Sequence, residues 1–208
     1  MTSDWESSVR SPTRLAAVAQ SGLVGIGPED PFDRLIELAV ELIGVQRGVI
    51  ALVDAERTTA MSSAGFPEGL ALFAPIDKSF CRFVVGSGRP FIVEDAHHDP
   101  RTSGDPAIEA FGAVSWAGYP IEDADGVVLG TFCVMDSNPH EWTPRDLQVL
   151  ATLAMAASTE IALRMARADL GCAQGSVTYG ALSVVRRTLQ DVHATKCAPR
   201  DSNPKPAD

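Results

Sequence analysis

The sequence predicts an α+β domain in which one antiparallel sheet is covered on one face by helices from the two ends of the chain. Two stretches of apolar, β-rich residues, at 48–63 and 117–136, each enclose a short turn and therefore predict hairpins with antiparallel pairing. Helical periodicity is strongest outside these hairpins, at 31–44 and from 143 onwards. Helices that flank a run of hairpins are expected to pack as one layer on the sheet.

Composition limits the classes of protein to be considered. The chain has 208 residues, of which 45% are apolar and 21% are charged, as in an ordinary globular domain with a sizeable core. The formal net charge of −10 disfavours partners that carry negative charge, so we expect neither nucleic acid nor an anionic membrane surface as a partner. We also expect no membrane span, because no stretch approaches roughly 20 consecutive apolar residues.

The first ten residues have neither the basic start nor the apolar core of a signal peptide, so we expect a cytoplasmic protein with reduced thiols. We divide the chain into a flexible N-terminus at 1–11, a domain with its flanking helices at 12–169, an extension with one short helix at 170–195, and a disordered tail at 196–208. The tail is assigned as disordered because it is rich in proline and poor in apolar side chains.

Two helices are predicted before the first hairpin. The first covers 12–20 and stops before Gly22. The second has Asp30 as a suitable N-cap and Pro31 in its first turn, and it ends at Gly44. Its apolar residues recur at helical spacing and are Phe32, Leu35, Ile36, Ala39, Val40 and Ile43.

Short elements follow between the two hairpins. Ser79 is a suitable cap for a helix over 79–85, and the β-rich residues 91–93 predict a strand. Asp105, followed by proline, starts another short helix that reaches Phe111.

The second hairpin supplies the central strands of the predicted sheet. Its turn is at 123–126, and the strand over 127–135 is apolar at nearly every position, which is typical of a strand buried on both faces. Gly130 within this strand predicts a bulge or a close backbone approach. Thr143 then caps a helix that reaches Asp169.

Motifs that would identify a reaction are absent from the sequence. There is no GxGxxG after a strand, no GxxxxGK[ST] phosphate loop, no GxSxG and no HExxH. His97, His98 and Asp99 are adjacent on one loop and point in different directions, which favours a surface loop over a metal or haem site. We therefore predict no catalytic residue set and no metal site.

Six segments together resemble the GAF domain family. They are PFDRLIELAVELIGV (31–45), IALVD (50–54), SFCRFVVGSGRPFIVEDAHHDPR (79–101), AGYPI (117–121), GVVLGTFCVMD (126–136) and WTPRDLQVL (142–150). Their order and spacing are specific jointly rather than singly, and the resemblance covers about residues 12–168. It implies a central antiparallel sheet with the terminal helices on one face and, on the other, a ligand pocket roofed by the middle of the chain.

The chain departs from several kinds of GAF domain. The NKFDE motif of cyclic-nucleotide-binding members is absent, and Cys81 is followed by Arg82 where many bilin-attaching members have Cys-His. Free methionine sulfoxide reductases of this fold use neighbouring cysteines in a sequence context that differs from Cys81 and Cys133. The sequence therefore identifies no cofactor.

The resemblance also implies which side chains line the pocket. Small-molecule sites are mostly apolar with a few polar anchors, although core packing explains each of these residues equally well. Trp116 and Tyr119 are three residues apart on one strand, so we expect them to point to opposite faces. The candidate pocket residues are Phe73, Ile76, Phe80, Cys81, Phe83, Phe111, Trp116, Tyr119, Cys133 and Met135.

The apolar neighbours of Cys81 and Cys133 favour packing over redox chemistry for both. Arg82 is the only sequence neighbour of Cys81 that would lower the pKa of its thiol. If the helix over 79–85 lies on the strand that contains Cys133, the two thiols approach each other, and a disulfide then requires Cα atoms within about 7 Å.

The last helix carries an apolar stripe. Its residues at 3-4 spacing are Leu147, Leu150, Ala154, Ala157 and Ile161. The stripe packs either on the chain's own helices or against the same helices of a second copy. Because GAF domains often dimerise through these helices, we expect a homodimer.

The resemblance implies a sensory or regulatory function without an enzymatic active site. An unidentified small molecule or a redox cue alters the pocket, and the sheet passes the change through the terminal helices to a partner signalling protein. Two alternatives remain open: a thiol-dependent reductase of the free methionine sulfoxide reductase type that uses Cys81 and Cys133, and a protein-interaction scaffold with a filled pocket.

Overall fold

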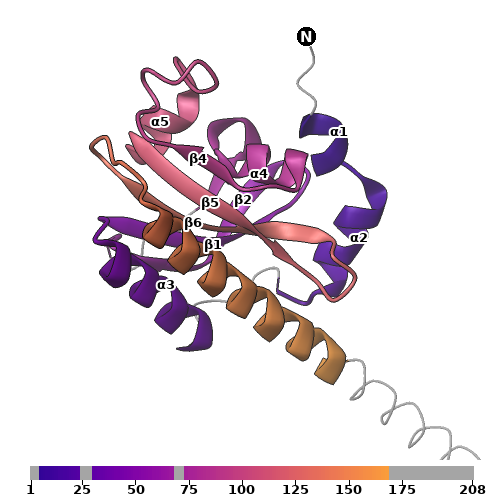
Figure 1. Ribbon diagram of the computed structural model, residues 1–208. Helices are drawn as coiled ribbons and strands as arrows, with labels where there is room; N and C mark the ends of the chain where they lie inside the picture. Colours follow the sequence, from indigo (N-terminus) through magenta and orange to yellow (C-terminus); the bar gives the residue numbers. More distant parts are fainter. Residues whose placement is uncertain (1–4, 24–29, 68–72, 169–208) are drawn as a thin grey trace, which may run out of the picture. The chain divides into compact units, whose positions relative to one another are not determined.

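A six-stranded sheet forms the centre of the protein (Figure 1). The computed structural model describes residues 5–23, 30–67 and 73–168. The strands are β1 (Arg47–Val53), β2 (Arg57–Ala64), β3 (Phe73–Pro75), β4 (Phe91–Val93), β5 (Ser115–Glu122) and β6 (Val128–Asp136). They are arranged in the order β3-β2-β1-β6-β5-β4, and every neighbouring pair is antiparallel. The predicted α+β class is confirmed.

Helices cover both faces of this sheet. They are α1 (Trp5–Val9), α2 (Pro12–Gln20), α3 (Asp30–Ile43), the 3-10 turn η1 (Ile76–Lys78), α4 (Cys81–Ser87), α5 (Pro106–Phe111) and a C-terminal helix (Pro144–Ala168). Figure 1 shows α3 and the C-terminal helix on one face and α4 and α5 on the other. Residues up to Met165 form one compact unit, and the second unit begins at Ala166. The predicted extension and tail, at 170–208, lie outside the described residues.

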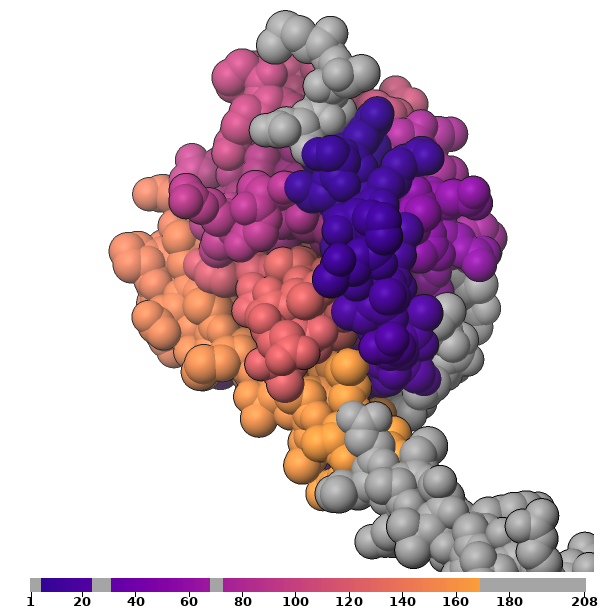
Figure 2. All heavy atoms as spheres, turned by 90° about the vertical axis from the view of Figure 1, so that its right-hand side faces the viewer, coloured from indigo at the N-terminus to yellow at the C-terminus, as the bar shows by residue number. Residues whose placement is uncertain are grey.

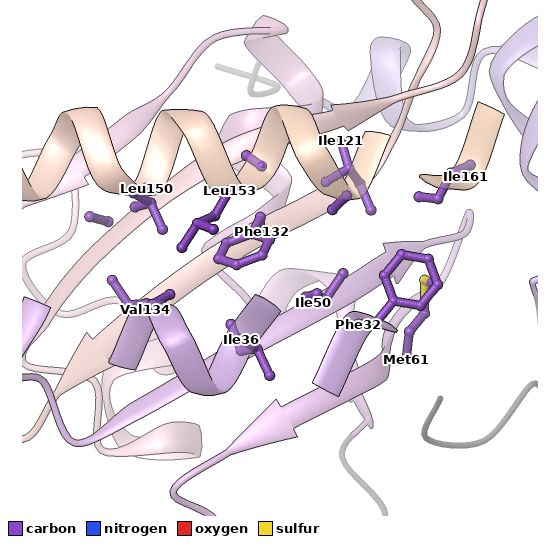
Figure 3. Close-up of a cluster of buried hydrophobic side chains, with 14 of the residues drawn as sticks. Phe32, Ile36, Ile50, Met61, Ile121, Phe132, Val134, Leu150, Leu153 and Ile161 are labelled. Carbon is purple, nitrogen blue, oxygen red and sulfur yellow. The ribbon is translucent and has the colours of Figure 1, made fainter. Parts of the chain in front are cut away.

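Each face of the sheet has its own apolar cluster. On one face, side chains of α3 and the C-terminal helix meet the sheet around Phe132 and Val134, as Figure 3 shows. The cluster on the opposite face contains Cys133 and Met135 from the same strand. Successive side chains of a strand point to opposite faces, so β6 contributes to both clusters. Every residue of β6 after Val128 is buried, which confirms the prediction of a strand covered on both faces.

A close backbone contact occurs at Gly130 of β6. A Cβ atom at this position would lie 1.9 Å from the carbonyl oxygen of Ala51 on β1. The pairing of β5 with β6 shifts beside it, because Ile121 pairs with Gly130 whereas Glu122 pairs with Val128. The structure thus confirms that this glycine marks both a bulge and a close approach.

The expectation of a flexible N-terminus does not hold for Trp5–Val9, which form α1. Val9 is fully buried. Trp5 packs closely on α4: a Cβ atom added to Gly86 of α4 would lie 2.4 Å from the Cβ atom of Trp5. Trp5 and Val9 are four residues apart, which places both on one side of a short helix. Figure 2 shows α1 and α2 as an indigo band along one side of the molecule.

The side chain of Arg14 connects α1 and α2 to the sheet through hydrogen bonds. It is buried, and its guanidinium group donates to the carbonyl oxygens of Val9 at 2.6 Å and Val53 at 2.7 Å. A buried arginine was not expected from the sequence, but its five donors suit carbonyl groups that would otherwise lack partners at the end of a helix and of a strand.

The C-terminal helix begins with the predicted cap. The Thr143 Oγ1 atom accepts the N–H of Asp146 at 3.2 Å, and Asp146 Oδ2 accepts the N–H of Thr143 at 3.0 Å. By length and composition, one helix of the described residues could cross a membrane, and it is this one. Its buried residues pack on the sheet, as those of a core helix do.

Candidate ligand cavity

A small cavity lies between the sheet and the segment that includes α4 and α5. Its volume is about 30 Å³, which is room for a water-sized molecule and well below the roughly 150 Å³ of a cavity that accepts benzene. Its walls are mostly apolar. The lining residues are Val49, Ala51, Thr58, Ala60, Phe73, Ser79, Phe80, Cys81, Ala107, Phe111, Ala113, Trp116, Cys133 and Met135.

Helix α4 brings Cys81 to the cavity. The Ser79 Oγ atom accepts the backbone N–H of Cys81 at 3.3 Å, and Gly88 ends the helix in the left-handed conformation at φ 65°. Cys81 and Val84 are buried towards the sheet. The predicted short helix is therefore present, with its first residue two positions later than expected.

A buried ion pair joins α4 to α5. Arg82 Nη2 donates to Asp105 Oδ2, and the two side chains are only 7% and 9% exposed. Arg82 also donates to the carbonyl oxygen of Ser79 at 2.8 Å, and Asp105 Oδ1 caps α5 by accepting the N–H of Ala107 at 2.9 Å. The guanidinium group therefore connects the two helices that line the cavity and is not directed at the neighbouring thiol.

Aromatic rings pack around one side of the cavity. Phe80 meets Trp116 edge-on with ring centroids 6.0 Å apart, and Phe83 stacks on Phe91 at 4.6 Å. The indole ring of Trp116 lies over Gly118, where a Cβ atom would be 2.2 Å from it. A side chain at Gly118 would therefore displace the tryptophan from the cavity wall.

The two buried cysteines meet at this cavity. Both thiols are buried in its wall and influence each other, and the Thr131 hydroxyl donates to Cys81 Sγ at 3.1 Å. Thr131 and Cys133 are two residues apart on β6, so both point to the face covered by α4. Cys133 Sγ also lies 3.4 Å from the carbonyl oxygen of Val49.

Hydrogen bonding makes the two thiols unequal. The bond from Cys133 is the largest influence on Cys81 and lowers the pKa of its thiol, with further lowering from Ser79 and Thr131, while burial opposes them. The same bond and burial raise the pKa of Cys133. Cys81 is therefore the better nucleophile of the two, and Cys133 retains its proton.

Thr58 supplies a polar group to the cavity wall. Its side chain is buried, and its Oγ1 atom has no hydrogen-bond partner among the described residues. A buried hydroxyl without a partner costs about 1–3 kcal/mol, so it is suited to a polar atom of a bound molecule. Sequence reasoning missed this residue, although the alternation of β2 places Thr58 and Ala60 on one face.

The candidate pocket residues fall into three groups. Seven of them, Phe73, Phe80, Cys81, Phe111, Trp116, Cys133 and Met135, line the cavity. Ile76 and Phe83 belong to the apolar cluster around it but do not line it. Tyr119 packs on the cluster of the opposite face, as the strand alternation between Trp116 and Tyr119 predicted.

The stripe on the C-terminal helix packs within the chain. Leu150, Ala154, Ala157 and Ile161 are at most 2% exposed and contact the sheet cluster, and Leu147 is partly buried against it (Figure 3). Of the two arrangements considered for this stripe, the structure therefore has the intramolecular one. Four of the five are covered within the chain, and Leu147 is partly exposed.

The histidine loop is held by its own hydrogen bonds. Asp99 Oδ1 accepts the N–H of Arg101 at 2.8 Å, and Arg101 reaches the carbonyl oxygen of Ile92 on β4 at 2.7 Å. His98 Nδ1 lies 2.7 Å from Asp95 Oδ2 on the surface. Within the described ranges, no group of three or more His, Cys, Asp or Glu side chains could hold a metal ion.

An antiparallel sheet with α3 and the C-terminal helix on one face and a cavity on the other defines a class of regulatory domains. The chain belongs to the GAF domain family, whose model matches residues 27–161. The resemblance drawn from the sequence is thereby confirmed.

Relatives of known function and structure share this domain. A cyclic di-GMP phosphodiesterase of Pseudomonas aeruginosa is 30% identical over 144 residues, which are 68% of this chain and 24% of that protein. The GAF domain of an Acinetobacter phosphoenolpyruvate-protein phosphotransferase has 20% identity and a TM-score of 0.56, with 76% of this chain and 96% of that chain covered. A free methionine-R-sulfoxide reductase of Neisseria meningitidis has 16% identity and a TM-score of 0.53, with 76% and 88% covered. At these identities the two structures show a shared fold.

Bilin, which some GAF domains attach through a cysteine, does not fit this cavity. A volume of about 30 Å³ is too small even for benzene, and a linear tetrapyrrole is several times larger. The residue after Cys81 is Arg82, which is committed to its ion pair with Asp105.

Proposed function

We propose that this chain is a sensory GAF domain in which a small molecule or a redox change at the cavity alters the sheet, and the terminal helices carry the change to a partner protein. The arrangement of β6 supports this most directly. Cys133 and Met135 line the cavity, whereas Phe132 and Val134 of the same strand pack under the C-terminal helix (Figure 3). A displacement of β6 at the cavity therefore acts directly on that helix.

Strand β5 gives a second connection between the two faces. Trp116 lines the cavity, and Ile121 packs in the cluster beneath the C-terminal helix. At the end of the strand, the backbone N–H of Glu122 donates to Ser158 Oγ on that helix at 3.0 Å. A shift along β5 would therefore strain or release a specific hydrogen bond.

The role we assign is regulatory rather than enzymatic. The phosphodiesterase relative is much longer than this chain, which spans about a quarter of its length, 24%. We therefore extend to this chain a regulatory part in signalling and not the phosphodiesterase reaction.

The paired thiols favour one second candidate, a thiol-dependent reductase of free methionine sulfoxide. In that reaction Cys81 would attack the sulfoxide sulfur and Cys133 would resolve the intermediate. A cavity of about 30 Å³ is too small for an amino acid, which ranks this candidate second. A scaffold with a filled pocket ranks third, because a cavity of about 30 Å³ remains and its wall includes the Thr58 hydroxyl, which has no hydrogen-bond partner in the part of the chain that the structure describes.

We place the expected homodimer on a different face from the stripe named above. The exposed large apolar residues of α3 and the C-terminal helix are Leu38, Leu42, Met155 and Leu163. These helices lie on the same side of the sheet, so a second copy can cover the four side chains with its own in a two-fold arrangement.

Filling the cavity tests whether it communicates with the C-terminal helix. Ala60→Leu adds bulk to the cavity wall and stands in for a bound molecule, so we expect altered hydrogen exchange of backbone amides at 144–168. Ala110→Leu, on the exposed surface of α5, is the matched control and should leave that exchange unchanged. Equal exchange in the two variants and the unmodified protein would contradict the proposed function.

A further inference from the structure

The geometry points to the Cys81–Cys133 pair as a reaction site for hydrogen peroxide, which converts the two thiols into a disulfide bond between α4 and β6. Both thiols line one cavity and contact each other, with Thr131 bonded to Cys81. This inference rests on the proposed sensory function and names the signal that the cavity receives.

The size of the cavity selects the oxidant. About 30 Å³ accommodates a molecule with two oxygen atoms but not a bulky organic hydroperoxide or an amino acid sulfoxide. The remaining wall is apolar except for a few hydroxyl groups, of which Thr58 has no partner among the described residues. We assign this hydroxyl to a hydrogen bond with a peroxide oxygen, which holds the molecule beside the thiols.

The reaction proceeds in two balanced steps. The Cys81 thiolate attacks one peroxide oxygen, an S–O bond forms as the O–O bond breaks, and hydroxide leaves and is protonated to water. Cys133 then loses its proton and attacks the Cys81 sulfur, the S–S bond forms as the S–O bond breaks, and a second water leaves. In sum, two thiols are oxidised to one disulfide while one hydrogen peroxide is reduced to two waters.

The environment of each sulfur matches these different roles. Cys81, whose pKa is lowered by its hydrogen bonds, is the attacking thiolate. Cys133, whose pKa is raised, keeps its proton until the second step, donating it in a hydrogen bond to the carbonyl oxygen of Val49 at 3.4 Å, and gives it to the leaving hydroxide when the S–S bond forms. Burial opposes ionisation of the Cys81 thiol, and this is offset by hydrogen bonding, including the bond that the Thr131 hydroxyl donates at 3.1 Å.

Disulfide formation would move α4. A disulfide S–S bond is about 2.05 Å long, shorter than a hydrogen-bonded contact between thiols, so oxidation draws α4 onto β6. Helix α4 contacts α1 through Trp5 and is tied to α5 through the Arg82–Asp105 pair. Oxidation of the two sulfur atoms would therefore change the contacts of α4 with both α1 and α5.

The test uses the full chain with Cys172→Ser and Cys197→Ser, so that only the cavity thiols remain. After hydrogen peroxide treatment at pH 7, peptide mapping should find Cys81 linked to Cys133. The rate should exceed that of a cysteine peptide by roughly tenfold, since an ordinary thiol is only a few per cent ionised at this pH. A rate equal to that of the peptide, or two free thiols after treatment, would overturn the inference.

Two variants separate the roles of the residues. Cys133→Ser should stop at the Cys81 sulfenic acid, trapped by dimedone, with no disulfide. Thr58→Val should slow oxidation roughly fivefold, the value of one lost hydrogen bond, while the thiolate absorbance titration stays unchanged. If the Thr58→Val variant is oxidised as fast as the protein with threonine at this position, Thr58 does not bind the peroxide.

Two further oxidants test the size argument. Relative to their rates with a cysteine peptide, tert-butyl hydroperoxide should react roughly tenfold more slowly than hydrogen peroxide. Free methionine sulfoxide should not oxidise the pair, and if it does so as fast as hydrogen peroxide, the inference fails in favour of the reductase.

The outcome separates this chemistry from the proposed function. If the disulfide forms but hydrogen exchange at 144–168 does not change, the peroxide site stands and the transmission to the C-terminal helix is wrong. If no disulfide forms while Ala60→Leu alters that exchange, the sensory cavity stands and its signal is not peroxide.

Discussion

The Thr131 hydroxyl is one of the groups that stabilise a negative charge on Cys81. It donates to Cys81 Sγ at 3.1 Å from a position on β6 that is fully buried. Because the hydroxyl is a donor to the thiolate, its removal should favour the protonated form. Thr131 also lowers the pKa of Cys133, so its removal should raise the pKa of both thiols.

We expect Thr131→Val, which keeps the shape of the side chain, to raise the pKa of Cys81 by about one unit, since a hydrogen bond to a charged group is worth about 1.5 kcal/mol. Thiolate forms as pH rises through this pKa, so the midpoint of thiolate absorbance should move to higher pH. The titration is read as the difference from a Cys81→Ser variant.

Thr152→Val is the matched control for this titration. Thr152 is exposed on the C-terminal helix, where its hydroxyl donates to the carbonyl oxygen of Gln148 at 2.8 Å, and it is not part of the cavity. It should leave the midpoint unchanged. If the midpoint of thiolate absorbance is the same in Thr131→Val and in the unmodified protein, the Thr131 hydroxyl does not stabilise the Cys81 thiolate.

Sequence reasoning reached these residues only in part. It found Cys81 and Cys133 and stated the condition under which they approach, but it favoured packing because their sequence neighbours are apolar. The largest influence on Cys81 comes from Cys133, and Ser79 and Thr131 add to it; Cys133 and Thr131 are about fifty positions away and are brought close by the placement of α4 on β6. Arg82, the sequence neighbour that was expected to lower the pKa of Cys81, forms an ion pair with Asp105 instead.

At the scale of secondary-structure elements, β6 leaves no room for a side chain at Gly130. The Cβ atom of any residue at position 130 would meet the backbone of Ala51, which cannot move without breaking the pairing of β1 with β6. We expect Gly130→Ala to destabilise the protein by about 2–3 kcal/mol, measured from its denaturant midpoint.

Gly126→Ala in the turn before β6 makes the same chemical change in open space. It is strained only by its positive φ of 77°, so we expect a cost of about 1 kcal/mol. If Gly130→Ala lowers the free energy of unfolding by no more than Gly126→Ala does, the close approach of β1 and β6 at Gly130 is wrong.

The elements that sequence reasoning predicted well are those with local signals. Helices α2 and α5 have the expected bounds, and the hairpin of β5 and β6 has its turn where Asp and Gly predict it. The elements β3, η1 and α1 were missed, because each has at most five residues and, unlike β4, none is a run of β-rich apolar residues. Segments this short are fixed by the surfaces they contact, such as β2 for β3, rather than by their own periodicity.

At the scale of the whole molecule, the exposed apolar residues of α3 and the C-terminal helix determine the proposed assembly. Met155→Glu with Leu163→Glu places charge in the proposed interface, where burial without a partner is costly. In light scattering at micromolar concentration, we expect twice the chain mass of 22.0 kDa for the unmodified protein and the single mass for this variant.

Ala110→Glu adds charge to the exposed surface of α5, on the other side of the sheet, and should leave the mass unchanged. A mass near 22.0 kDa for the unmodified protein would contradict the dimer. A dimer that persists in the Met155→Glu, Leu163→Glu variant would place its interface elsewhere.

Strand β6 pairs with a neighbour on each edge and is covered on each face. The strand has no free surface along which its residues could loosen one at a time. If a signal at the cavity displaces β6, as we propose, the strand would move as one unit, and the C-terminal helix would respond without any segment of the chain unfolding.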